Sequence, residues 1–547
     1  MTPHPEITST LSLWHIALLL GPALASLAVS LFAGAHASNL AVWRAARWAT
    51  SAGIGFAALS LAAVLSGTAG AGYGLRADVV GAVVMLLVSF VGWVIVRYSQ
   101  PYLNGEREER HYVRWLMATL TTVGLVAATN HVLVLALAWT ATSLALHQLL
   151  TFFGERPAAV VAAHKKFLVA RLADLFMLAA AGLLFLAFGT MHIDQMGRIA
   201  AAAPQLPLAA QAAVLLIACS ALLKCAQLPF HGWLIQVMEA PTPVSALLHA
   251  GVVNLGGFVL MRFAPLLADV PQAQVLLVAA GTATAVLAAL VMTTRISIKV
   301  MLAWSTCAQM GFMVMQCGLG AWDMALLHLV AHSLYKAHAF LGAGGAVRRA
   351  MLEQLTPPAR TPGALALALG ACAGVAMTLL AGAVAGLLVP AHSATPAIWV
   401  LAAIVAFALV PLVNAQSLRL GGWWLPALGL GAFAVALAYF GLHALFAGLM
   451  QPVAAPPPAA PKTLWVGVAL AFAALFLLQS LVTVLPHASW VRRLYPWFYG
   501  GLFLDEKFNR MSFALWSPPG PRGGGGPLAS PDTSLAIDTT AATSVRP

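Results

Sequence analysis

The sequence predicts an all-α fold, a polytopic membrane bundle of about fifteen transmembrane helices with at least one broken helix. Three observations predict it. Charged residues make up only 8% of the chain and apolar residues 61%, whereas a soluble globular protein carries about 25% charged residues. The apolar residues gather in runs of about 20, the length that crosses a bilayer. Prolines interrupt the chain next to a lysine that lies inside one such run.

Fifteen apolar runs are candidate membrane spans, and the loops between most of them are short. In chain order the runs are Leu11–Phe32, Trp48–Ser66, Val79–Val96, Trp115–Ala128, Val132–Phe153, Phe167–Phe188, Leu208–Gln227, Val244–Phe263, Val275–Met292, Val300–Leu319, Met324–Val347, Ala364–Val389, Ile398–Val413, Trp424–Met450 and Leu464–Leu485.

The distribution of Lys and Arg predicts the orientation of these spans. The odd-numbered loops hold fifteen of them, Lys165 and Lys166 included, whereas the even-numbered loops hold four, Arg262 included. Cytoplasmic loops are enriched in Lys and Arg, so we expect the N-terminus outside and the C-terminus in the cytoplasm. The net charge of +12 is thereby explained by topology, and we expect no nucleic-acid partner.

Three basic residues remain inside or at the edge of apolar runs: Arg171, Lys224 and Lys336. A charge at bilayer depth is costly and usually marks a functional site. Lys224 precedes Pro229, and Pro241 and Pro243 follow soon after. Because proline cannot donate a hydrogen bond to a helix, this region is expected to form a broken helix of the kind that builds transporter sites. Lys224 could then bind and release a proton, the alternative being a lysine that snorkels or pairs structurally.

A row of ionisable residues follows in the eleventh run. His328, His332 and Lys336 are spaced i, i+4, i+8, which places them on one helix face. Such a row can pass protons because histidine titrates near neutrality; buried structural histidines are the alternative. His249, about two turns after Pro241 and Pro243, is a candidate link between Lys224 and this row.

The remaining charged pair is Arg171 and Asp174, whose i, i+3 spacing allows an ion pair. A structural pair and a role in coupling remain equally open. Carboxylates are scarce within the apolar runs, and this favours a proton path over a sodium site, which needs several oxygen ligands. The pattern of Cys and His predicts no metal site in this chain.

These residues resemble the antiporter-like L subunit of respiratory complex I, from about Leu75 to Leu420 and more loosely over Tyr495–Trp516. The resemblance implies two inverted five-helix repeats, with Lys224 as the broken-helix lysine and His249, His332 and Lys336 as relay groups. It also matches Arg171 and Asp174 to the family's Arg-x-x-Asp. The matching strings are Lys224-Cys-Ala-Gln-Leu-Pro229, Pro241-Thr-Pro-Val-Ser-Ala-Leu-Leu-His-Ala250, Lys299-Val-Met-Leu-Ala-Trp-Ser-Thr306 and the segment from His328 to Phe340.

The chain departs from that family at two places. Thr140 follows Trp139 where the family has a glutamate, so Lys224 is expected to lack its carboxylate partner. The family's exit lysine has no counterpart between Gly363 and Thr395.

Three further strings resemble the B subunit of the DAB-type inorganic carbon transporters, a divergent relative. This resemblance implies a transport subunit of the cell inner membrane that is not itself an enzyme and carries no cofactor. Its implied partner is a zinc-containing A subunit, similar to a β-carbonic anhydrase, which hydrates CO₂ while protons move down their gradient through the membrane subunit. The strings are Arg97-Tyr-Ser-Gln-Pro-Tyr-Leu-Asn-Gly-Glu106, His147-Gln-Leu-Leu-Thr-Phe-Phe-Gly-Glu-Arg-Pro157 and Ala163-His-Lys-Lys166.

Two alternatives stay open: a proton-translocating subunit of an NADH–quinone oxidoreductase or of a multisubunit cation/proton antiporter, and a passive membrane anchor. The expected divisions are residues 1–130 (N-terminal helices), 131–270 and 271–420 (two antiporter-like repeat regions), 421–485 (C-terminal helices), 486–516 (an amphipathic segment at the cytoplasmic face) and 517–547 (a disordered tail).

Overall fold

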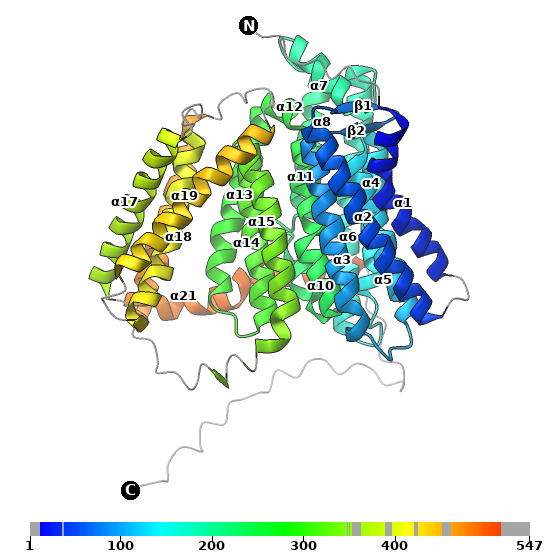
Figure 1. The fold of residues 1–547 in the computed structure, drawn as a ribbon. Coiled ribbons are helices and arrows are strands. Elements are labelled where there is room, and N and C mark those ends of the chain that lie inside the picture. Colours follow the sequence, from blue (N-terminus) through cyan, green and yellow to red (C-terminus); the bar gives the residue numbers. More distant parts are fainter. Residues whose placement is uncertain are drawn as a thin grey trace.

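The computed structural model describes residues 11–34, 38–346, 348, 351–352, 363–388, 396–420, 425–450 and 461–515. Over these residues the chain is almost entirely helical, with most helices running roughly parallel or antiparallel to one another (Figure 1). The predicted tail, residues 517–547, lies outside the described residues.

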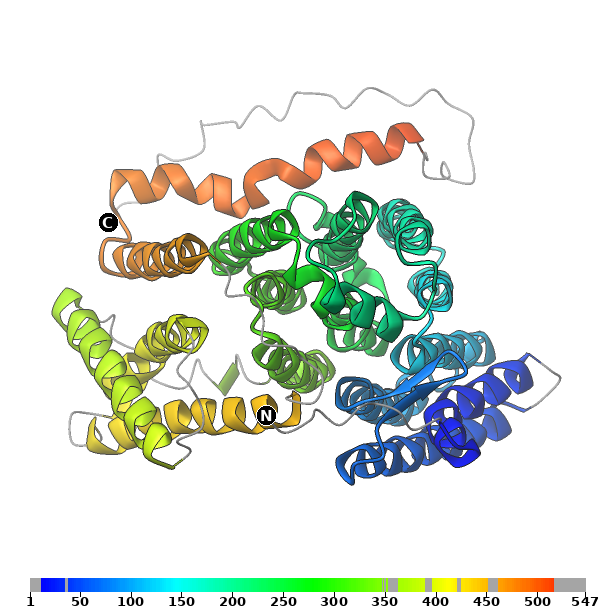
Figure 2. The same cartoon turned by 90° about the horizontal axis from the view of Figure 1, so that it is seen from above.

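The N-terminal block packs at one side of the bundle (blue in Figures 1 and 2). A short antiparallel hairpin, β1 and β2, caps it between the second and third helices. We call the end of the bundle that carries this hairpin the hairpin end. The elements are α1 (Leu13–Ala33), α2 (Asn39–Leu65), β1 (Gly70–Gly72), β2 (Leu75–Ala77), α3 (Val79–Tyr102) and α4 (Glu109–Ala128).

The next group of helices contains two interruptions. α8 ends at Lys224, and the chain continues through a non-helical stretch to the short helix α9. A second bend at Gly251 separates α10 from α11. Pro241 precedes α10 and Pro243 lies in its first turn, where a missing N–H costs nothing. The elements are α5 (Val132–Leu150), α6 (Pro157–Phe188), α7 (Ile193–Ala202), α8 (Leu208–Lys224), α9 (Gly232–Gln236), η1 (Val237–Glu239), α10 (Thr242–Ala250), η2 (Val252–Asn254), α11 (Leu255–Arg262) and α12 (Ala264–Ala268).

The remaining helices complete the bundle. The three helices α17, α18 and α19 form a group beside it, and α21 and α22 run end to end along one flank (orange to red in Figure 2). The elements are α13 (Pro271–Met292), α14 (Ile298–Gly318), α15 (Trp322–Leu341), η3 (Gly342–Gly345), α17 (Ala364–Leu388), α18 (Pro396–Leu420), α19 (Leu425–Met450), α20 (Lys462–Val484), α21 (Ser489–Tyr499), η5 (Gly501–Phe503) and α22 (Leu504–Leu515).

The helices confirm the predicted all-α membrane bundle with a broken helix. Among the described residues, 11 helices are long and apolar enough to cross a membrane, and α8 and part of α18 are shorter apolar helices. Each of the fifteen predicted spans overlaps a helix. Thirteen of them overlap the helices just described, and the other two overlap α4 and α15. The count of fifteen membrane crossings stays a prediction.

Small residues allow a close helix contact between α13 and α14. A Cβ added to Gly281 would lie 2.6 Å from the carbonyl oxygen of Gly311, so only glycine fits there. Such close approach is a common way for membrane helices to associate, since burial of apolar surface gives little driving force in lipid. The contact fixes the position of α14, which lies beside α15.

Candidate functional site

An ion-pair cluster surrounds Lys224 at the end of α8. Its ammonium lies 2.6 Å from Oδ1 of Asp174 on α6, and the guanidinium of Arg171 lies 2.7 Å from Oδ2 of the same carboxylate. The side chains of Lys224 and Asp174 are only 9% and 7% exposed. The prediction that Lys224 lacks a carboxylate partner was therefore wrong: Asp174, reaching across the α6–α8 contact, supplies it.

Helix α5 also contacts Lys224, through the ring and the backbone carbonyl of Trp139. The ammonium lies 4.0 Å from the centroid of the Trp139 ring and donates a 3.4 Å hydrogen bond to the Trp139 carbonyl oxygen. An aromatic face and a carbonyl both attract a cation. Lys224 is also the last residue of α8, where the helix dipole favours positive charge. Thus α5 helps to hold the cation without the glutamate that Thr140 replaces.

A second buried lysine lies beside this cluster. Lys166 donates hydrogen bonds to the carbonyl oxygen and the hydroxyl of Ser143, at 2.6 and 2.9 Å. A cavity of about 30 Å³ is lined by Lys166, Lys224 and Trp139, and also by Val252 and Val253 from the second interruption. That volume is enough for a water molecule. The cavity therefore connects the lysine pair to the bend that follows His249.

Three basic residues assigned to loops from the sequence are in fact buried in helices: Lys165, Lys166 and Arg262. The first two belong to α6, which begins at Pro157 and is longer than its apolar run. Proline at the first helical position was the sequence signal for this earlier start. Arg262 ends α11 and pairs with Asp78 at the hairpin end.

Lys165 holds the C-terminal segment against the bundle. Its ammonium, which is fully buried, lies 3.1 Å from Oδ1 of Asp505 on α22. Asp505 Oδ2 also accepts a 2.7 Å hydrogen bond from the Gln236 amide at the end of α9. The amphipathic segment thus reaches the broken-helix region directly. Its predicted place at the membrane face stays a prediction.

The predicted row of residues lies along one face of α15. The rings of His328 and His332 are 5.9 Å apart between centroids. His328 Nδ1 is 3.0 Å from Gln316 Oε1, and Lys336 donates a 3.2 Å hydrogen bond to the Leu302 carbonyl oxygen. Lys336 is fully buried, and no carboxylate of the described residues lies within 4.0 Å of its ammonium.

His249 connects the interruption to this row. His332 Nε2 is 3.3 Å from the His249 carbonyl oxygen, and the His249 ring stacks on Phe340 at 4.4 Å between centroids. Both ring nitrogens of His249 are buried and make no hydrogen bond to the described residues. The structure therefore joins His249 directly to the row. Its connection to Lys224 runs through the cavity that Leu248, Val252 and Val253 line.

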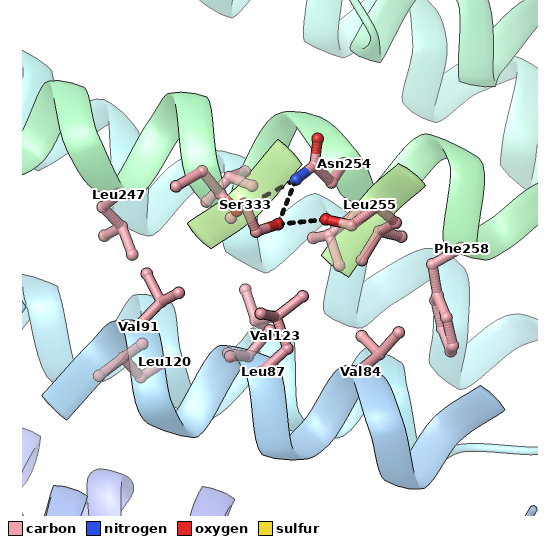
Figure 3. A pocket seen from close by; sticks show the side chains of 15 residues that line it. Val84, Leu87, Val91, Leu120, Val123, Leu247, Asn254, Leu255, Phe258 and Ser333 are labelled. Atoms are coloured by element: carbon pink, nitrogen blue, oxygen red, sulfur yellow. Dashed lines mark hydrogen bonds between the residues drawn. The ribbon is translucent and has the colours of Figure 1, made fainter. Parts of the chain in front are cut away.

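A hydrogen bond between Asn254 and Ser333, next to His332, ties the second interruption to α15. Asn254 donates a 2.7 Å hydrogen bond to the hydroxyl of Ser333, and the two side chains meet at the edge of a small apolar pocket (Figure 3). Val84 and Leu87 of α3 line the opposite wall. This hydrogen bond fixes the bend near His249 relative to the α15 row.

At the hairpin end, Asp78 receives two cations. Arg76 Nε lies 2.8 Å from its Oδ2, and Arg262 pairs with the same oxygen. Burial alone would raise the pKa of Asp78, but the charges of Arg262 and Arg76 and the Gly81 N–H outweigh it and lower that pKa. The pair ties α11 to the start of α3. Within the described residues, no group of three or more His, Cys, Asp and Glu side chains is arranged to hold a metal ion.

Comparisons with known proteins agree with this architecture. A family model described as NADH:quinone oxidoreductase/Mrp antiporter, transmembrane, matches residues 129–408. The "probable inorganic carbon transporter subunit DabB" of Hydrogenovibrio crunogenus is 43% identical over 441 residues, covering 79% of this chain and 82% of that protein. DabB2 of Halothiobacillus neapolitanus, named in the same way, is 37% identical over 493 residues, covering 86% and 88%.

Among solved structures, the Mrp complex from Dietzia sp. matches with a TM-score of 0.54 and 25% identity, covering 93% of this chain and 57% of the matched chain. The matched family segment contains Lys224, His249 and the α15 row. The chain therefore belongs to the NADH:quinone oxidoreductase/Mrp antiporter family of membrane subunits, in the branch of the DabB inorganic carbon transporter subunits.

Proposed function

We propose that this chain is the membrane subunit of an energy-coupled inorganic carbon uptake complex. It conducts protons down their gradient and so drives a zinc-binding, carbonic-anhydrase-like partner that hydrates CO₂. The printed names of the two DabB relatives support the transport class. The alternatives, a subunit of a quinone-linked pump or of a cation/proton antiporter, share the family model. Relatives named NADH-quinone oxidoreductase subunit L are 34–35% identical but match only 52–53% of this chain, whereas the two DabB relatives match 79% and 86% of it.

The observation that carries the proposal is the series of buried ionisable groups across the bundle. Lys224 pairs with Asp174 at one side, and a cavity joins Lys224 to the interruption after His249. From there His332 and His328 continue along α15. Burying so many ionisable groups in a membrane bundle is costly, which argues against a passive anchor.

The path would operate by stepwise proton transfer. Lys336 and the two histidines of α15 take protons from the hairpin end, which the positive-inside rule assigns to the outside. His249 passes them toward Lys224 through water in the interruption. Lys224 alternates between its Asp174-paired charged form and a neutral form that has released its proton toward the cytoplasm.

Purification of the chain with its partners tests the proposal. The chain is extracted in mild detergent with an affinity tag, and co-purifying proteins are identified by mass spectrometry with zinc analysis. One large soluble zinc protein that hydrates CO₂ is the expected result. A set of flavin or iron–sulfur proteins, or of small membrane subunits without zinc, would contradict it.

A further inference from the structure

We propose that Lys166 and His147 form the cytoplasmic exit of the proton path. They take protons from Lys224 and release them at the end of the bundle opposite the hairpin. The inference rests on the proposed function and extends its path by these two residues.

One face of α5 leads from Lys224 to that end. Trp139, Ser143 and His147 follow one another at intervals of four, so they lie along one side of the helix. Each interval rises about 6 Å. Thr129 bridges to β2 just before α5 begins, so α5 starts at the hairpin end, and His147 lies in its last turn.

Each position on that face contacts or carries a basic group. Lys224 donates a 3.4 Å hydrogen bond to the Trp139 carbonyl oxygen. Lys166 donates to the carbonyl oxygen and the hydroxyl of Ser143, at 2.6 and 2.9 Å. His147 itself supplies an imidazole one turn further on. The face of α5 therefore sets three groups that can carry a proton in order, from the end of α8 to the end of α5.

The step from Lys224 to Lys166 crosses the cavity of about 30 Å³ that both side chains line, which has room for a water molecule. Asp174 pairs with Lys224 and Arg171, and no carboxylate of the described residues lies within 4.0 Å of the Lys166 ammonium. A further unpaired charge inside a membrane bundle is costly. Lys166 in its neutral form is therefore suited to accept the proton that Lys224 releases.

The step from Lys166 to His147 leads out of the core. Lys166 is only 6% exposed, whereas His147 is partly exposed. Of the basic side chains near His147, Lys166 acts on it most strongly, ahead of His164 and Arg171. The ring of His164 on α6 stacks over the His147 ring at 6.3 Å between centroids. The exit thus lies between the end of α5 and the first turns of α6.

Each transfer moves one proton and leaves its donor ready for the next. An N–H bond of the Lys224 ammonium breaks, and the proton passes through water to form an N–H bond on the neutral Lys166 amine. The Lys166 ammonium then protonates the His147 imidazole through water, and the imidazolium gives its proton to water at the cytoplasmic face. The net change is one proton moved from Lys224 to the cytoplasm, with Lys166 and His147 neutral again.

A structural role is the alternative, because Lys166 also ties α6 to α5 through Ser143. Lys166→Arg separates the two roles, since arginine keeps the charge and can bond to Ser143 but does not release a proton. The complete complex is reconstituted in vesicles with a pH dye inside. We expect Lys166→Arg to slow proton entry about 100-fold, the lower end of what losing a proton-transfer group costs. Proton entry at the wild-type rate would overturn the inference.

His147→Gln tests the second group at a partly exposed position, where the fold tolerates a change more readily. It should slow proton entry by a similar factor, and an unchanged rate would also overturn the inference. His111→Gln is the matched control, because His111 is exposed in the first turn of α4, at the same end of the bundle. It should leave proton entry unchanged.

A buffer confined to one side of the membrane locates the exit. The dipeptide β-alanyl-histidine carries an imidazole, and its charges keep it on the side where it is placed. Sealed inside vesicles whose interior corresponds to the cytoplasm, it should restore proton entry in His147→Ala, whereas the same dipeptide outside should not. Rescue from the outside, or no rescue from the inside, would contradict the assignment.

Lys224→Met in the same vesicles separates this inference from the proposed function. If Lys224→Met blocks proton entry while Lys166→Arg and His147→Gln conduct normally, the exit is wrong and the path stands. Full proton entry in Lys224→Met would remove the proposed function itself.

Discussion

The ammonium of Lys224 lies 2.6 Å from Oδ1 of Asp174, across the contact between α8 and α6. Asp174 thus supplies a carboxylate to Lys224, which Thr140 cannot do. The guanidinium of Arg171 binds the other carboxylate oxygen, Oδ2. Lys224 therefore sits between one anion, one neighbouring cation and the face of Trp139. Small movements of Asp174 between Arg171 and Lys224 would change how strongly Lys224 holds its proton.

Replacing Asp174 should abolish proton conduction. Asp174→Asn leaves Lys224 without a carboxylate, and losing one member of a buried ion pair costs about 3–5 kcal/mol. Thermal unfolding in detergent and proton entry into vesicles measure the two effects. Asp269→Asn, at an exposed loop carboxylate, is the control. Because the residues interact, the Asp174→Asn/Lys224→Met double variant should be more stable than the sum of the single effects predicts; simple additivity would mean that the pair is not coupled.

The contact between Lys165 and Asp505 should fasten the C-terminal segment. Asp505→Asn removes the charge that faces a fully buried ammonium, so α22 should detach and become sensitive to limited proteolysis. Glu506→Gln is the matched control, since the Glu506–Arg510 pair is exposed and such pairs contribute about 0.5 kcal/mol or less. Equal protease resistance in Asp505→Asn and wild type would show that other contacts hold the segment.

The sequence predicted the spans and the α15 row because both depend on local spacing. Apolar runs define helices in lipid, and residues four apart share a helix face whatever their surroundings. The Lys224–Asp174 and Lys165–Asp505 pairs could not be predicted in this way, because they depend on which helices pack together. Lys165 and Lys166 were placed in a loop because charged residues flank the apolar run, although Pro157 indicated an earlier helix start.

The α13–α14 contact should tolerate no side chain at Gly281. Gly281→Ala places a Cβ 2.6 Å from a backbone oxygen, and such overpacking costs about 1–3 kcal/mol. The variant should unfold at a lower temperature in detergent. Gly182→Ala on α6 has open space around its Cβ and should be neutral or slightly stabilising, since alanine favours helix. If the two variants unfold alike, the close approach is not required.

Asp78 should make the protein less stable in acid. Its pKa is lowered in the folded protein relative to the usual 3.8, so its stabilising contribution is fully present above 3.8 and is lost as the pH falls through the lower folded value. Asp78→Asn should reduce stability at neutral pH, because it leaves Arg262 buried without its carboxylate. The difference between variant and wild type should shrink toward low pH when unfolding is measured across the acid range. A constant difference would contradict the assignment.

The most direct test of the account measures inorganic carbon uptake and proton entry together in Lys224→Met and Lys336→Met. The complete complex is reconstituted in vesicles, with Arg198→Met as the control because the Arg198 side chain is 60% exposed. Both lysine variants should assemble with the partner yet lose proton entry and gradient-driven uptake together, while Arg198→Met should keep both. Full uptake in either lysine variant would contradict the proposal that protons pass through this row of buried groups.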